Sequence, residues 1–123
     1  MTMDNGQLKE NVLRDKYRFA LRIVKVYKYL LSEQKEFVLS KQLLRSGTSI
    51  GANVAEANQA RSRPDFVSKL SIALKEAVET ENWLNLLADS EYLTSEQSKS
   101  LLIDCEELVR ILTSSIKTTK PVV

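Results

Sequence analysis

Hydrophobic residues recur every three or four positions in four long stretches of the chain, and short polar breaks separate these stretches. This spacing places apolar side chains on one face of an α-helix. It predicts helices over about residues 7–32, 38–58, 64–89 and 95–116, followed by a frayed tail over residues 117–123. Four such helices with short connections predict an all-α fold, an antiparallel up-down-up-down four-helix bundle that forms one domain over residues 1–123.

Local signals support two of the predicted helix starts. Pro64 suits the first turn of the third helix, and Asp65 follows it where the helix dipole favours an acid. Thr94 and Gln97 have the spacing of a capping box at the start of the fourth helix. Only three glycines and two prolines occur in the chain, so few other breaks are expected.

The predicted helix over residues 38–58 has a run of small residues in its middle, around Gly47 and Gly51. The helical period of apolar positions continues through this run, and small side chains there would let two helix backbones approach closely. The two glycines do not indicate a phosphate-binding loop, because such a loop ends in Gly-Lys-Ser/Thr and follows a strand.

Composition narrows the classes of function. The chain has no histidine and a single cysteine, Cys105. One thiol cannot form an intramolecular disulfide, and it lacks histidine, its usual base in nucleophilic catalysis. We therefore expect Cys105 to be a small buried residue and the protein not to be an enzyme. Because neither a secretion signal nor a run of about 18 apolar residues is visible, we expect a cytoplasmic protein with no membrane partner.

Carboxylates on facing helices raise the question of a metal centre. Ferritin-like bundles combine glutamates with Glu-x-x-His motifs, whereas this chain offers Glu56, Glu76 and Glu79 without any histidine. We favour a solvated or salt-bridged face formed by Glu76, Glu79 and Glu81 over an all-carboxylate site, and we predict no metal and no other cofactor. Asn53 and Glu56 lie one turn apart. We expect them to join an interhelical polar network that fixes the register, with a functional polar site as the alternative.

Charge is distributed unevenly along the chain, although the net charge is only +2. Residues 1–35 carry eight basic and four acidic side chains, whereas residues 64–93 carry two and six. Five basic residues of the first predicted helix fall within about 120° of its circumference and form a positive stripe. They are Arg14, Arg18, Arg22, Lys25 and Lys28.

Such a stripe is the electrostatic footprint of nucleic-acid binding, and Arg61 and Arg63 would extend it at one end of the bundle. The alternative is a solvated face whose cations pair with acids of neighbouring helices. Aromatic residues of the same helix are expected in the core or in an interface rather than as platforms for stacked bases. They are Tyr17, Phe19, Tyr27 and Tyr29.

Residues 41–57 read KQLLRSGTSIGANVAEA, and residues 65–87 contain DF, LSIALKEA and ETENWL. In these stretches the chain resembles the bacterial four-helix bundle proteins named for intervening sequences in 23S ribosomal RNA genes. The resemblance implies a small bundle, and some members of that family assemble as homopentameric rings. A similar bundle, the accessory protein of diversity-generating retroelements, is a basic pentameric barrel that binds nucleic acid and a reverse transcriptase. The resemblance supplies no catalytic residue.

The sequence thus leaves two main hypotheses. The first is a non-enzymatic homo-oligomer, a pentameric ring if the resemblance extends to assembly, that binds RNA or DNA through the basic stripe. The second is a protein-interaction or self-assembly scaffold without nucleic-acid binding, which would use the apolar arc of the first helix and the small residues of the second. A carboxylate metal bundle is a third alternative.

Overall fold

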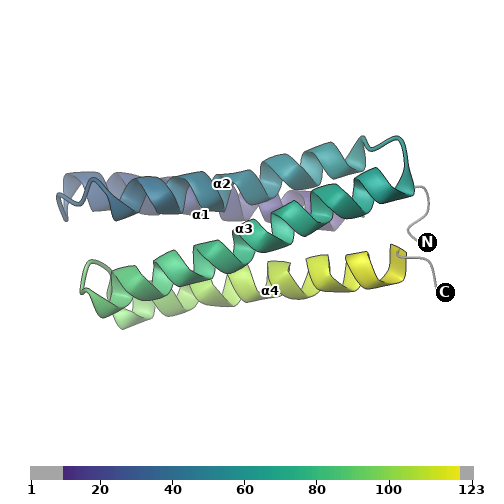
Figure 1. Ribbon diagram of the computed structural model, residues 1–123. Coiled ribbons are helices and arrows are strands. Elements are labelled where there is room, and N and C mark those ends of the chain that lie inside the picture. Colours follow the sequence, from purple (N-terminus) through teal and green to yellow (C-terminus); the bar gives the residue numbers. More distant parts are fainter. Residues whose placement is uncertain (1–9, 120–123) are drawn as a thin grey trace.

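The computed structural model describes the backbone of residues 10–119 and the side chains of residues 14–119. It contains four helices, α1 (Glu10–Ser32), α2 (Leu39–Asn58), α3 (Arg63–Asp89) and α4 (Ser95–Thr119). Consecutive helices run antiparallel, which confirms the predicted four-helix bundle (Figure 1). Over residues 10–119 no helix combines the length and the apolar character needed to cross a bilayer.

The predicted helix boundaries differ from the observed ones mainly at the end of α4. Residues 117–119 continue that helix, so the prediction that they are frayed is wrong, whereas residues 7–9 and 120–123 lie outside the described part of the chain. Ile116 is buried in the core. The hydroxyls of Thr118 and Thr119 donate to the carbonyl oxygen of Ser115 at 3.1 and 2.7 Å. The helix thus continues for almost one turn beyond its predicted end.

The predicted signals at the starts of α3 and α4 are confirmed. The Oγ of Ser62 accepts a hydrogen bond from the N–H of Asp65 at 3.2 Å, with Pro64 in the first turn. The N–H of Thr94 donates to Gln97 Oε1 at 2.8 Å, and the N–H of Gln97 donates to Thr94 Oγ1 at 3.1 Å. Both caps satisfy backbone donors that a helix start leaves without partners.

The start of α2 is capped by Glu36, which the sequence analysis did not single out. This side chain is only 8% exposed and accepts hydrogen bonds from the N–H groups of Val38, Leu39 and Ser40, at 3.2, 2.9 and 2.7 Å. Burial disfavours the charged form of Glu36, but the backbone donors outweigh burial and lower the pKa of Glu36 below its ordinary value. Glu36 therefore acts as an ionised cap at neutral pH.

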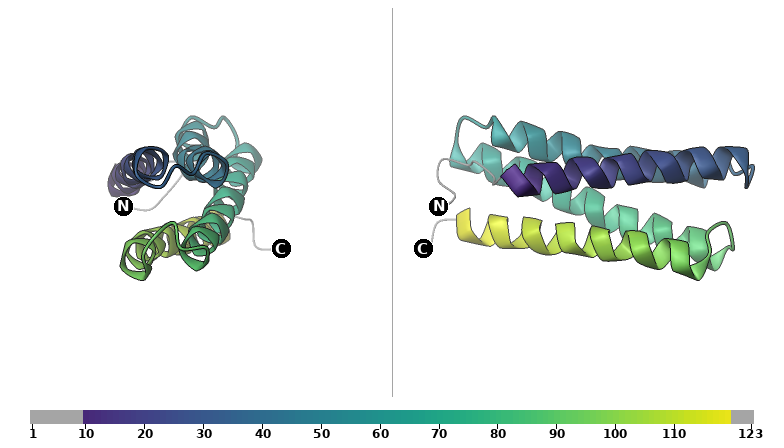
Figure 2. Two further views of the ribbon diagram at one scale, coloured as in Figure 1. Left: turned by 90° about the vertical axis from the view of Figure 1, so that its left-hand side faces the viewer. Right: turned by 180° about the vertical axis from the view of Figure 1, so that it is seen from behind.

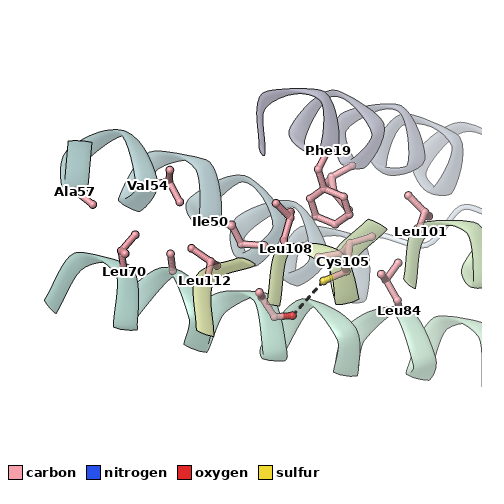
Figure 3. Packing of buried hydrophobic residues seen from close by; sticks show 14 of the residues in the cluster. Phe19, Ile50, Val54, Ala57, Leu70, Leu84, Leu101, Cys105, Leu108 and Leu112 are labelled. Carbon is pink, nitrogen blue, oxygen red and sulfur yellow. Dashed lines mark hydrogen bonds between the residues drawn. The ribbon is translucent and has the colours of Figure 1, made fainter. Parts of the chain in front are cut away.

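One cluster of buried apolar side chains, contributed by all four helices, forms the core (Figure 3). Fully buried members include Ile23, Leu30, Leu43, Ile50, Phe66, Leu70, Leu84 and Leu87. Cys105 lies among them, and its Sγ donates to the carbonyl oxygen of Ala77 at 3.3 Å. Burial, with a smaller contribution from nearby carboxylates, raises the pKa of Cys105 to about 12. The thiol is protonated at neutral pH, and the prediction of a buried cysteine is confirmed.

The small residues of α2 serve the contact between α1 and α2. Both Gly47 and Gly51 are buried. A Cβ added at Gly47 would lie 2.9 Å from two side-chain carbons of Ile23 in α1, closer than real Cβ atoms come to their neighbours. The predicted close approach of two helices is therefore present. α1 covers this surface of α2. The surface is therefore not free to receive a partner, although the scaffold hypothesis required a free surface there.

Among the helix pairs that contact each other, α1 and α4 pack least closely. In the end-on view the four helices follow one another around the bundle in chain order, so that α4 also neighbours α1 (Figure 2, left). Two hollows of about 230 and 440 Å³ open along the seam between α1 and α4. The seam lies between the basic helix α1 and α4. Cations of α1 that point into the seam lie near α4, whereas cations on the outer side of α1 face solvent.

Candidate nucleic-acid interface

The solvent-exposed face of α1 carries four of the five cations of the predicted positive stripe. Between residues 14 and 31, the exposed side chains are Arg14, Tyr17, Arg18, Leu21, Lys25 and Lys28, which we name the α1 ridge. At 100° per residue they occupy an arc of about 100°, and they extend for about 21 Å along the helix. The α1 ridge contains no acid, so it is a continuous positive surface interrupted only by one tyrosine and one leucine.

Arg22 does not belong to the α1 ridge, because its side chain turns into the seam. Its guanidinium donates to Asp104 Oδ2 at 2.5 Å and to the Oγ of Ser100 at 2.9 Å, both on α4. The Arg22 side chain is 34% exposed. For this residue the alternative drawn from the sequence holds, since its charge is paired with an acid of a neighbouring helix.

Arg18 is only weakly held. Its nearest acid is Asp15, three residues earlier on α1, at 3.8 Å, and both side chains are solvent-exposed. An exposed pair at this spacing contributes about 0.2–0.5 kcal/mol, which does not prevent the guanidinium from reaching another anion. Among the described side chains, Lys25 and Lys28 form no ion pair.

The charged residues of α4 along the seam are mainly acidic. Asp104 and Glu107 line the smaller hollow together with Arg18, and Glu96 lines the larger one with Lys25. Glu107 also pairs with Arg110 on its own helix. The positive surface of α1 therefore ends at the seam and does not continue onto this side of α4.

Arg61 and Arg63 are exposed at the connection between α2 and α3. In Figure 1 this connection lies at the end of the bundle where α1 begins, the same end as Arg14 within α1. The arrangement is compatible with an extended basic patch, and the participation of Arg61 and Arg63 stays a prediction.

The aromatic residues of α1 divide between core and surface. Phe19 is buried, and Tyr27 and Tyr29 are half-buried, with Tyr29 Oη accepting a hydrogen bond from Gln34 at 2.9 Å. Tyr17 is 62% exposed, so it does not lie in the core, and an interface position stays a prediction for this residue. The apolar arc of α1 is wider than its contacts with α2 and α4 cover, and Tyr17 lies on the uncovered part.

Asn53 and Glu56 do not form the joint network that the sequence suggested. The exposed Glu56 bridges to Lys69 of α3, with 2.9 Å between Oε1 and Nζ, and this partner raises the pKa of Lys69. Asn53 Nδ2 instead donates to the carbonyl oxygen of Ser49 within α2, at 2.9 Å. Only Glu56 links two helices, and the prediction for Asn53 is wrong because its side chain bonds to the preceding turn of its own helix.

The main polar network between α2 and α3 is centred on Arg45. Its guanidinium pairs with Glu76 at 3.0 Å and with Glu79, and Ser49 Oγ donates to Glu76 Oε2 at 2.5 Å. Burial disfavours the charged form of Glu76, but the hydrogen bond from Ser49 and the charge of Arg45 outweigh it and lower the pKa of Glu76. The two glutamates thus form the salt-bridged face that the sequence analysis favoured.

Two further members of the interface between α2 and α3 were missed. Thr80 Oγ1 donates to Ser46 Oγ at 2.9 Å, and both side chains are fully buried. A signal was present, because Ser46 lies three residues after Leu43 and Thr80 three residues after Ala77, on the apolar faces of their helices.

The described side chains offer no metal site of the kind considered from the sequence. No group of three or more His, Cys, Asp or Glu residues within residues 14–119 is placed to hold a metal ion. Glu76 and Glu79, the candidates on α3, are paired with the guanidinium of Arg45.

The model of the family described as 23S rRNA-intervening sequence protein matches residues 9–114. The chain belongs to this family. A crystal structure from the same group of proteins, a protein of unknown function from the S23 ribosomal protein family of Bacteroides thetaiotaomicron, is 59% identical. The similarity covers 86% of this chain and 98% of that chain, with a TM-score of 0.85. No curated protein matches the chain.

Membership of the 23S rRNA-intervening sequence protein family confirms the resemblance seen in residues 41–57 and 65–87. The crystal structure from Bacteroides thetaiotaomicron has the same fold. Neither comparison names a ligand or an activity. What the protein binds therefore depends on features of its own surface, among them the α1 ridge.

Proposed function

We propose that the protein is a non-enzymatic helical bundle that binds RNA or DNA through the α1 ridge. The observation that supports this function is the row of four exposed cations, Arg14, Arg18, Lys25 and Lys28, on a helix face without an acid. Each cation that contacts a phosphate releases condensed counterions, which drives binding regardless of sequence. Arg22 is omitted from the site because Asp104 already neutralises it.

The test compares two triple variants of equal charge. One carries Arg14→Gln, Lys25→Gln and Lys28→Gln on the α1 ridge. The control carries Lys41→Gln, Lys75→Gln and Lys99→Gln, which remove exposed cations from α2, α3 and α4. In fluorescence anisotropy at about 50 mM salt, the ridge variant should bind a labelled oligonucleotide at least about tenfold more weakly than the control. Equal affinities of the two variants, or no binding by the unmodified protein, would reject the proposal.

A second candidate is a scaffold that assembles with further copies of itself, in a pentameric ring if this chain follows the resemblance. Its support is the pair Tyr17 and Leu21, one turn apart on α1 and 62% and 52% exposed. Burying two such side chains against a second copy would contribute several kcal/mol. Light scattering should then report an oligomer, and Leu21→Gln should dissociate it. A monomer at micromolar concentration would argue against self-assembly, and a nuclease-resistant protein partner recovered from the host would favour a heterologous scaffold.

A further inference from the structure

We propose that the α1 ridge selects single-stranded over duplex nucleic acid, with an unpaired base stacked on Tyr17 and the phosphates on either side of that base held by the neighbouring cations. This inference rests on the proposed function and specifies its ligand.

The position of Tyr17 supports a stacking role. The side chain is 62% exposed and stands within the cation row, one turn from Arg14 and adjacent in sequence to Arg18. Proteins that bind single strands combine a cationic track with an aromatic ring on which a base stacks, and every base offers a face for such a contact. Leu21 adds apolar surface one turn further along, before Lys25 continues the track. A base in a duplex is already stacked on its neighbours and cannot use the ring.

The surface beside the α1 ridge on the α4 side does not suit a second strand. The two strands of a duplex are separated by grooves about 12 and 6 Å wide, comparable with the usual spacing of about 8–10 Å between packed helices. A second strand on this side would lie over the seam, where α4 presents Glu96, Asp104 and Glu107. Arg22 would offer little to the phosphates of that strand, because it is already paired with Asp104.

The surface on the α2 side offers little more positive charge. The exposed cations of α2 are Lys41 and Arg45. Arg45 is held between Glu76 and Glu79 of α3. This leaves Lys41, together with the half-buried Lys16 on the side of α1 that faces α2, to meet a second strand. The positive surface is therefore about one helix wide, which fits one phosphate backbone better than two.

The test uses labelled single strands of about 12 nucleotides, a length typical of single-strand sites, as DNA and as RNA, together with the duplex of the same sequence. We expect at least one single strand to bind about tenfold more tightly than the duplex in fluorescence anisotropy at low salt. Tyr17→Ala should weaken single-strand binding about 5- to 150-fold, whereas Tyr17→Phe should retain it. The matched control is Phe37→Ala, which removes an aromatic side chain that is 52% exposed but lies outside the α1 ridge.

Duplex binding that equals single-strand binding, or Tyr17→Ala with unchanged affinity, would overturn this inference. If the unmodified protein bound the duplex and the triple variant of the α1 ridge did not, the proposed function would still hold, and only the preference for single strands would be rejected. Failure of every probe to bind would reject both. A loss of affinity in Tyr17→Ala that accompanies a change of oligomeric state in light scattering would also overturn the stacking role.

Discussion

Replacing Gly47 with alanine should destabilise the bundle, although alanine favours helices. The added Cβ would lie 2.9 Å from Cγ1 and Cγ2 of Ile23 and 3.2 Å from its Cδ1. Ile23 is fully buried, and its two γ carbons are fixed close to the backbone, so the clash cannot be relieved by turning the end of a flexible side chain. Overpacking of this kind costs about 1–3 kcal/mol, and the gain in helix propensity offsets about 1 kcal/mol of that cost.

Gly51→Ala is the matched control, because it brings the same gain in helix propensity one turn later on α2. There the nearest atom is the Cδ of Lys16 at 3.1 Å, part of a flexible side chain that can shift. We expect Gly51→Ala to be neutral or to stabilise the protein by up to about 1 kcal/mol. Urea unfolding at one fixed protein concentration should therefore place Gly47→Ala about 1–3 kcal/mol below Gly51→Ala.

A second substitution at Ile23 identifies the clash as the cause. Ile23→Val removes only Cδ1 and should not rescue Gly47→Ala. Ile23→Ala removes both γ carbons, at a cost of about 2–5 kcal/mol on its own, and in that background Gly47→Ala should become as favourable as Gly51→Ala. If both glycine variants stabilise the otherwise unmodified protein equally, the close approach of α1 and α2 at Gly47 is not a constraint and the reasoning fails.

Three further predictions concern caps and carboxylates. Glu36→Ala should cost about 2 kcal/mol in urea unfolding at neutral pH, because three N–H groups lose a charged acceptor; a loss below 0.5 kcal/mol, the lower end for caps, would contradict this role. Burial and the charge of Glu106 raise the pKa of Glu81 in the folded protein, so the folded state holds the proton of Glu81 more tightly than the unfolded chain does. The free energy of unfolding should therefore fall as pH rises from about 4.5 through that raised pKa. Unfolding series across pH should show a smaller decline in Glu81→Gln, and an unchanged pH profile would refute the assignment. Glu91 has φ of 69°, so Glu91→Gly should raise the melting temperature by relieving about 1 kcal/mol of strain; a lower melting temperature would argue against it.

The fold was predictable because hydrophobic periodicity is a property of each helix alone. The same pattern continued through the small residues around Gly47, where helix propensity by itself indicated a loop. Pro64 and the pair of Thr94 and Gln97 marked helix starts through local hydrogen-bonding chemistry. Glu36 was missed because the usual capping signature has a short polar residue at the cap, whereas here a longer carboxylate reaches three N–H groups from further back in the chain.

The candidate interface was predictable only in part, because it depends on how helices are rotated against each other. Five cations share one side of α1 in sequence, but the pairing of Arg22 with Asp104 depends on the placement of α4, which periodicity does not specify. Tyr17 fell at the edge of the predicted apolar arc, and its exposure depends on how much of that arc α2 covers. The side chain of Asn53 donates a hydrogen bond to a carbonyl oxygen of its own helix. The spacing of residues in the sequence does not distinguish such a bond from a contact between helices.

The salt dependence of oligonucleotide binding tests the central claim most directly, since that claim is that the α1 ridge presents cations free to pair with phosphates. If its four cations each contact one phosphate of a single strand, log affinity should fall against log salt concentration with a slope of about −3. The triple variant of the ridge should reduce this slope to about −1. A slope near zero, or no binding to any oligonucleotide at low salt, would contradict the account.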